Sequence, residues 1–495
     1  MSTQSFLADF SILVMNGQKP GRHMKAIANA AIWATLLVVL TAAPGHLGAS
    51  EIKPAPILKV IPERALVDEP VEITIEGLNA GEHVTVQATL HDHGGSDWSS
   101  HAIFAANESG RVIVAKQAPV EGTYEGVDAM GLFWSMVRLR ETKEDPEFFA
   151  GQVEPGQGMT MVFKATAPGR PPAETAIQRM WADSSIVRET VREDGLFGTF
   201  YYPADSEPVA AILHPHGGFC LMPEKPAAVL ASRGFAVLAL KYCGEDGLPE
   251  NTGSEIALEY FETAMNWLQA RPETASGKIG VVGMSLGGTL ALLLGSRFEQ
   301  VGAAVSIKGS GVIVNFKFTQ NGEPVPATRM QGTEILADAL RAAQRPECRP
   351  ESPGGEWSCY NWETTHFMFV LFHGFAEPDA LYPGVIPVER INGPVMLVSG
   401  FDDQSWPSTL YSEVAFQRLK DNEFTHKFEH LAYPGAGHRL GIAHLPRTDA
   451  GVDWHTWGGN ARDAGAANAD YWPKMIEFLR NSLETRATEA TKRSD

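Results

Sequence analysis

The five residues at 283–287, Gly-Met-Ser-Leu-Gly, constrain the fold of this chain more than any other segment. They follow the apolar run 279–282, which predicts a buried strand, and precede the apolar stretch 288–294, which predicts a packed helix. A serine between two glycines at such a junction is typical of a nucleophile elbow, a sharp turn that exposes the hydroxyl above a sheet. Leu286 would then begin the helix and direct its N–H at a developing oxyanion. The alternative interpretation is a glycine-rich turn whose serine only caps the helix.

A serine hydroxyl is a weak nucleophile without a base, so a histidine and an acid are expected further along the chain. His438 ends a glycine-rich loop, Gly-Ala-Gly-His, after a short predicted strand, and is the predicted general base. The predicted strand 394–400 runs into an acidic loop that contains Asp402 and Asp403. The order serine, aspartate, histidine is that of α/β-hydrolases. Spacing alone does not choose between the two aspartates, and the one that is not the catalytic acid could cap the following helix. The alternative for His438 is a histidine on a surface loop.

A second oxyanion donor is expected from the loop after the apolar strand 209–214. This loop has the sequence Pro-His-Gly-Gly-Phe at 215–219, and its glycines allow the backbone to approach a substrate oxygen closely. We expect the N–H of Phe219 or Gly218 to act together with that of Leu286. An ordinary glycine turn is the alternative.

Composition narrows the possible partners. The chain has 495 residues, 44% of them hydrophobic and 20% charged, which is typical of a globular protein with two or three domains. Its formal net charge of −19 argues against nucleic acid as a partner. The four cysteines lack zinc-finger spacing and no His-Glu-x-x-His motif occurs, so neither a metal nor another cofactor is expected.

The N-terminal 49 residues are predicted to be a signal peptide. An apolar stretch at 26–43 follows three basic residues, and Ala49 offers a small residue at the cleavage position. The start could be Met1 or Met24. The protein is therefore expected to be exported to the periplasm or secreted; an uncleaved anchor is the alternative, and the protein would be cytoplasmic if the segment is not a functional signal. No stable membrane span is expected after cleavage.

Export would permit disulfides, and two pairings are considered. Cys348 and Cys359 flank a stretch rich in proline, glycine and serine and could close a small loop. Cys220 and Cys243 follow successive predicted strands of the same sheet and could lie close together.

Two domains are expected after the signal. Residues 50–185 contain short apolar runs, one clearly alternating, separated by Gly, Asn, Asp and Pro, which predicts a β-sandwich of roughly immunoglobulin type. The predicted strands of this domain lie at 58–61, 71–75, 84–90, 111–114 and 159–165. Such a domain alone would be typical of a binding module.

From 186 to 487, strands and helices alternate, which predicts an α/β-hydrolase domain with a mostly parallel sheet covered on both faces. Helices are expected near 224–233, 254–271 and 470–484. An insertion of about 312–384, with a helix near 333–343 and an aromatic run at 366–372, interrupts this domain, and residues 488–495 form a charged tail.

A further set of informative segments lies at 68–71, 75–78, 129–135, 233–237, 258–262, 386–390 and 457–459. Together these segments resemble the acyl-CoA thioesterase/bile acid-CoA:amino acid N-acyltransferase family. The resemblance implies Ser285 as nucleophile, His438 as base and Asp403, rather than Asp402, as the acid. A serine nucleophile resembles the hydrolytic branch, because the amino-acid-conjugating branch uses cysteine. The family commonly has lysine where this chain has Leu286, and the insertion around the cysteine loop is a second departure.

The sequence therefore predicts a serine hydrolase that cleaves acyl thioesters through an acyl-enzyme, with a small-molecule acyl thioester or ester as substrate. Because CoA is a cytoplasmic cofactor, export would favour other esters or thioesters. A carboxylesterase or a peptidase or lactone hydrolase outside the cytoplasm, an acyltransferase to an amine acceptor, and a non-catalytic binding protein stay open as alternatives. The oligomeric state is not predicted.

Overall fold

The computed structural model describes residues 53–93, 95–139, 152–328, 382–446 and 457–494, and the side chains of the last helix as far as Leu483. The described residues from Pro54 onward belong to one compact unit. The expected signal peptide, the Cys348–Cys359 pair, the helix near 333–343 and the aromatic run at 366–372 lie outside the described residues. Within the described residues, no helix is both long enough and apolar enough to cross a membrane.

The N-terminal part of this unit consists of two β-sheets. The smaller sheet has the order β1 (Ile57–Ile61), β3 (Glu72–Glu76) and β6 (Val112–Ile113). The larger sheet has the order β2 (Arg64–Leu66), β10 (Ala173–Met180), β9 (Gly158–Thr166), β4 (His83–His91), β5 (Asp97–Ala105) and β7 (Glu121–Gly122), with β8 (Val137–Arg138) also paired to β5. A short helix, α3 (Gly131–Trp134), precedes β8. All pairings are antiparallel except that of β2 with β10.

Alternating hydrophobicity explains how these two sheets pack. In β4 every second side chain is buried, as period-two patterning requires. Ile73 and Ile75 of the smaller sheet share one hydrophobic core with Val86, Phe104 and Phe163 of the larger sheet. Each of the five expected strand segments is found, with shifts of one or two residues at their ends. The immunoglobulin-type topology stays a prediction.

The second part contains an eight-stranded sheet. Its order is β11 (Ile186–Val191), β12 (Phe197–Pro203), β14 (Ala236–Lys241), β13 (Ala211–Pro215), β16 (Ile279–Met284), β17 (Val301–Ile307), β20 (Val395–Gly400) and β21 (Phe428–Tyr433). β12 pairs antiparallel to both of its neighbours, and all the pairings from β14 to β21 are parallel. This sheet order is that of an α/β-hydrolase.

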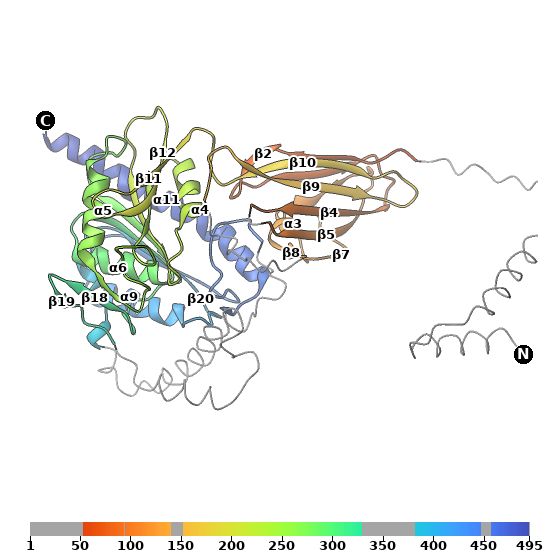
Figure 1. Ribbon diagram of the computed structural model, residues 1–495. Helices are drawn as coiled ribbons and strands as arrows, with labels where there is room; N and C mark the ends of the chain where they lie inside the picture. Colours follow the sequence, from red (N-terminus) through yellow and green to blue (C-terminus); the bar gives the residue numbers. More distant parts are fainter. Residues whose placement is uncertain (1–52, 94, 140–151, 329–381, 447–456, 495) are drawn as a thin grey trace, which may run out of the picture. The chain divides into compact units, whose positions relative to one another are not determined.

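Successive residues of the central strands enter different cores, so both faces of this sheet are covered. Val282 joins the core formed with α4 (Glu224–Ser232) and α11 (Ala461–Ser494), whereas Val281 joins the core formed with α5 (Leu258–Ala270), α6 (Leu286–Arg297) and α9 (Ser408–Asp421). Continuous apolar strands are the sequence signature of such a sheet. The expected mostly parallel, doubly covered sheet is therefore present (Figure 1).

Two predicted helices have different bounds in the structure. The helix expected at 254–271 begins at Leu258, because β15 (Glu255–Ala257) pairs with β18 (Lys317–Gln320), which in turn pairs with β19 (Glu323–Pro324). The C-terminal helix α11 begins at Ala461 rather than near 470, and Asn460 Oδ1 accepts the Asp463 N–H at 3.0 Å, as an N-cap does. The expected tail at 488–495 is helical as far as Ser494, since its Ala, Glu, Lys and Arg residues favour helix.

The carboxylate of Asp68, between β2 and β3, ties together segments far apart in the sequence. Its side chain is 3% exposed and accepts hydrogen bonds from Arg233, which follows α4, and from Trp472 Nε1 of α11 at 3.0 Å. Arg233 also donates to Glu69 at 3.1 Å. A buried charge with three donors is stable only while those donors remain in place.

We expect Asp68→Ala to lower the free energy of unfolding by about 2–3 kcal/mol, because it leaves the Arg233 guanidinium and the Trp472 N–H without their shared acceptor. The midpoint of urea unfolding measures this. Glu69→Ala is the matched control: the Glu69 carboxylate is 38% exposed, so a smaller loss is expected. Equal losses in the two variants would contradict the assigned role of Asp68.

Candidate active site

Ser285 occupies a strained turn between β16 and α6. Its backbone angles are φ 57° and ψ −124°, a conformation that residues with a Cβ rarely adopt. The turn is held by hydrogen bonds on both sides: Ser285 N–H donates to Ile307 O at 2.9 Å, and Ser285 O accepts the N–H groups of Gly288 and Thr289. The expected strand–turn–helix junction is present. The turn places the serine hydroxyl at the edge of the sheet where the parallel strands have their carboxyl ends.

The two flanking glycines make this turn possible. A Cβ added at Gly283 would lie 2.0 Å from Gly287 O. A Cβ added at Gly287 would lie 2.7 Å from Pro215 O and 2.9 Å from His216 O. Any larger residue at either position would force the backbone to shift, which explains the glycine on each side of the motif.

The structure brings Ser285, His438 and Asp403 together. Ser285 Oγ lies 3.0 Å from His438 Nε2, and His438 Nδ1 lies 2.8 Å from Asp403 Oδ2. The histidine and aspartate side chains are 3% and 0% exposed. The other Asp403 oxygen accepts the N–H groups of Ser405 and Trp406, which fixes the carboxylate. The neighbouring Asp402 has an exposed side chain, so of the two candidate acids Asp403 is the one that meets the histidine.

Three residues to which the sequence analysis gave no role in the site hold His438 in place. Trp457 O accepts the His438 N–H at 2.7 Å, and the Trp457 ring stacks on the imidazole with centroids 5.4 Å apart. Lys308 Nζ donates to His438 O at 2.6 Å, and Trp406 Nε1 donates to Lys308 O at 2.8 Å. Lys308 directly follows β17. The position of a residue immediately after a parallel strand was the one sequence signal that could have identified it.

Burial lowers the pKa of His438 below its ordinary value, and the positive charges of Lys308 and Arg439 act in the same direction. Asp403 opposes this shift through its charge and its hydrogen bond. The imidazole is therefore neutral near pH 7, with Nδ1 donating to the carboxylate and Nε2 available to accept the serine proton. The arrangement can activate Ser285 as a nucleophile.

The candidate oxyanion donors lie beside Ser285. Residues 216–219, here called the oxyanion loop, leave β13, and a Cβ added at Gly217 would lie 3.7 Å from Ser285 Cβ. This loop contains Gly218 and Phe219; Phe219 is 46% exposed, and its ring centroid lies 6.1 Å from that of Trp457. On the other side, Leu286 is the first residue of α6, where backbone N–H groups have no acceptor within the helix.

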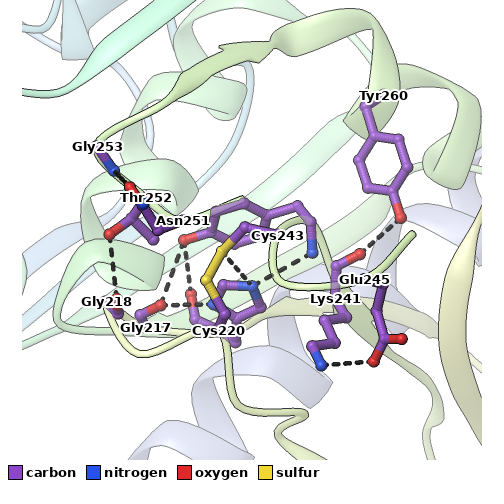
Figure 2. Close-up of a disulfide and its surroundings, with 12 residues drawn as sticks. Gly217, Gly218, Cys220, Lys241, Cys243, Glu245, Asn251, Thr252, Gly253 and Tyr260 are labelled. Atoms are coloured by element: carbon purple, nitrogen blue, oxygen red, sulfur yellow. Dashed lines mark hydrogen bonds and ion pairs between the residues drawn. A yellow bond between two sulfur atoms is a disulfide. The ribbon is translucent and has the colours of Figure 1, made fainter. Parts of the chain in front are cut away.

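Cys220 and Cys243 form a disulfide next to the oxyanion loop, with their Cα atoms 5.4 Å apart (Figure 2). This pairing was one of the two considered from the sequence. The ligand atoms of His216, Cys220 and Cys243 lie within 4.8 Å of one another. While the disulfide is intact, neither cysteine can supply the thiolate that a metal ion requires.

The order of the eight-stranded sheet and the hydrogen-bonded Ser285, His438 and Asp403 define an α/β-hydrolase. The chain also matches two family models: "Acyl-CoA thioester hydrolase/BAAT N-terminal region" over residues 68–193 and "BAAT / Acyl-CoA thioester hydrolase C terminal" over residues 256–485. It therefore belongs to the acyl-CoA thioester hydrolase/BAAT family and is an enzyme.

The names of similar proteins describe two activities, thioester hydrolysis and acyl transfer to an amino acid. The chain is 30% identical to the acyl-coenzyme A amino acid N-acyltransferase 2 of Rattus norvegicus, with 85% of this chain and 97% of the relative covered. It is 27% identical to the peroxisomal succinyl-coenzyme A thioesterase of Mus musculus, with 87% and 97% covered. Among solved structures, a putative dienelactone hydrolase from Klebsiella pneumoniae aligns with a TM-score of 0.36 and 14% identity, covering 59% of this chain and 97% of that one.

The rate constant for phosphonylation of Ser285 should fall as the pH decreases, and this acid limb should lie below pH 6.5. Burial and the nearby cations lower the pKa of His438, which must be neutral to accept the serine proton. Lys308→Met removes one of those cations, so the pKa should rise and the limb should move to higher pH. The measurement is the rate constant for phosphonylation of Ser285 by a fluorophosphonate between pH 4 and 9. Lys308→Arg keeps the charge and should leave the limb in place; a limb that stays put in Lys308→Met would refute this electrostatic role.

Proposed function

We propose that this enzyme is a serine hydrolase that cleaves acyl thioesters through an acyl-enzyme on Ser285. The observation that carries the proposal is the continuous chain of contacts from Ser285 Oγ through the His438 ring to the buried Asp403 carboxylate, in a member of this family. It supplies a nucleophile, a base and a group that orients the base, at hydrogen-bond distances from one another.

In the proposed reaction Ser285 Oγ attacks the thioester carbonyl while its proton moves to His438 Nε2. The Asp403 carboxylate then stabilises the imidazolium. The N–H groups of Leu286 and of Gly218 or Phe219 bind the oxyanion, and each such donor typically contributes about 2.7–4 kcal/mol to transition-state stabilisation. Collapse breaks the carbon–sulfur bond, His438 returns the proton to the departing thiolate, and a water molecule activated by the same histidine releases the acid.

The nucleophile favours hydrolysis over transfer to an amine. A serine acyl-enzyme is an oxygen ester, which is suited to attack by water, whereas a thioester acyl-enzyme on cysteine favours amine acceptors. The relatives' names support an acyl thioester as the substrate, since they describe coenzyme A thioesterases and an acyl-coenzyme A N-acyltransferase.

The test is hydrolysis of a panel of short and long acyl-CoA thioesters beside matched p-nitrophenyl esters, with the products identified in the presence and absence of glycine. We expect free acid in both conditions. Ser285→Ala and Asp403→Ala should each lower kcat by about 10⁴-fold or more. Asp402→Ala is the matched control and should stay close to the parent value, because its side chain is exposed.

Each departure from this result has a distinct meaning. Turnover retained in Ser285→Ala would refute the acyl-enzyme. Product that appears only with glycine would show an acyltransferase. Cleavage of esters with all thioesters ignored would show that the family scaffold serves another substrate class.

We also propose that the protein is exported. Two observations support this: the basic and then apolar segment before Ala49, and the Cys220–Cys243 disulfide, a bond that persists mainly in oxidising compartments. Outside the cytoplasm the leaving group of the acyl thioester would be a thiol other than CoA.

Mass spectrometry of the protein recovered from its native host tests this proposal. We expect the mature chain to begin at or close to Ser50 and to be found outside the cytoplasm, as cleavage after Ala49 requires. A chain that keeps its N-terminal segment in the cytoplasmic fraction would contradict export.

A further inference from the structure

We propose that the Cys220–Cys243 disulfide is a positioning element of the active site, which holds the oxyanion loop so that Ser285 reacts at its full rate only in the oxidised protein. This inference rests on the proposed roles of Ser285 and of the oxyanion donors.

The cross-link fixes the end of the oxyanion loop that the sheet does not. The loop begins at the end of β13, which is paired on both sides within the sheet. Its last residue, Phe219, is followed directly by Cys220, which the disulfide joins to Cys243, just beyond β14. The attachment point is itself anchored, because Tyr260 of α5 donates to Lys241 O at 2.6 Å (Figure 2).

Hydrogen bonds to the carbonyl groups of the loop orient its N–H groups. His216 O accepts the Tyr242 hydroxyl at 3.1 Å, and Gly217 O accepts His216 Nδ1 at 2.5 Å. Gly218 O accepts the Thr252 hydroxyl at 3.1 Å (Figure 2). A trans peptide group is planar and directs its N–H opposite to its C=O. Fixing the carbonyls of Gly217 and Gly218 therefore fixes the N–H directions of Gly218 and Phe219, the two candidate oxyanion donors.

Tyr242, the residue before Cys243, supports the loop through His216. The Tyr242 ring stacks on the His216 ring with centroids 3.7 Å apart, and the Tyr242 N–H donates to His216 Nε2 at 3.2 Å. Burial lowers the pKa of His216 to about 3, so the ring is neutral, with Nδ1 as donor and Nε2 as acceptor. The disulfide holds the loop at a fixed position relative to Tyr242. The two hydrogen bonds from Tyr242 to His216, one from its N–H and one from its hydroxyl, depend on that position.

Cys220 has an unusual backbone conformation at the point where the disulfide is attached. Its φ is +53°, in the left-handed region that residues with a Cβ avoid. Gly244, with φ +74°, passes so close that a Cβ there would lie 3.1 Å from Cys220 Cβ. If Cys220 moved to an ordinary extended conformation, the Phe219–Cys220 peptide group would rotate, and the backbone of Phe219, which carries one candidate donor, would shift with it. A displacement of about 1 Å in an active site can cost about 10²-fold in rate.

The experiment isolates this disulfide from the other cysteine pair by using the full chain with Cys348→Ser and Cys359→Ser. Dithiothreitol converts the disulfide into two thiols and is itself oxidised to its cyclic disulfide. The readout is the rate constant for phosphonylation of Ser285 by a fluorophosphonate at 25 °C, with the thiols titrated in parallel. We expect reduction to lower this rate constant by about 10- to 100-fold and reoxidation to restore it. Two titrated thiols with an unchanged rate constant would overturn the proposal.

A second variant tests the proposal if dithiothreitol does not reduce the disulfide, or if the chain with Cys348→Ser and Cys359→Ser does not fold. Cys220→Ser/Cys243→Ser in the full chain should show the same loss of reactivity, with kcat for the best substrate reduced more than KM is raised. A disulfide with a merely structural role would lower Tm and leave the rate constant at 25 °C unchanged, which would also overturn the proposal.

Failure of this inference differs from failure of the proposed function. Rapid phosphonylation with no thioester hydrolysis would reject the substrate class and leave the role of the disulfide intact. Thioester hydrolysis that is equally fast in the oxidised and reduced protein would reject the role of the disulfide alone.

Discussion

The strained turn at Ser285 is the constraint on which the rest of the site depends. A serine at φ 57° requires close backbone approach on both sides, and Gly283 and Gly287 provide it. The closeness of Gly287 to Pro215 O and His216 O also brings α6 against the end of β13. The elbow and the oxyanion loop are therefore parts of one packing arrangement, and neither can move without disturbing the other.

Parallel strands deliver the remaining groups to the same edge of the sheet. The oxyanion loop follows β13, Ser285 follows β16, Lys308 follows β17, Asp403 follows β20 and His438 follows β21. Three residues after these strands, Cys220, Ser285 and Lys308, have positive φ. Strain of this kind persists where the surrounding structure over-determines the backbone. Here the disulfide restrains Cys220, the flanking glycines accommodate Ser285, and the hydrogen bond to His438 O anchors Lys308.

Those parts of the site that depend on neighbouring residues could be predicted from local sequence patterns. The elbow follows from a serine between two glycines at the junction of an apolar strand and an apolar helix, and the position of His438 follows from a glycine-rich loop after a short strand. Asp403 could not be separated from Asp402 by spacing, because the choice depends on which side chain points to a histidine 35 residues away. The contacts of Lys308, Trp406 and Trp457 with His438 were missed for the same reason, because they are tertiary. Strand β15 was read as helix because its partner β18 lies about 60 residues further along the chain.

Two buried histidines near Ser285 show how local partners separate a base from a structural residue. Burial lowers the pKa of both His216 and His438. The Nδ1 of His216 meets a peptide carbonyl, Gly217 O, which offers little stabilisation to a charged ring, and its Nε2 already accepts the Tyr242 N–H. The Nδ1 of His438 meets the Asp403 carboxylate, which stabilises the imidazolium formed when Nε2 takes the serine proton. The two rings have the same chemistry and similar burial, so the carboxylate and the approach to Ser285 favour His438 over His216 as the proposed base.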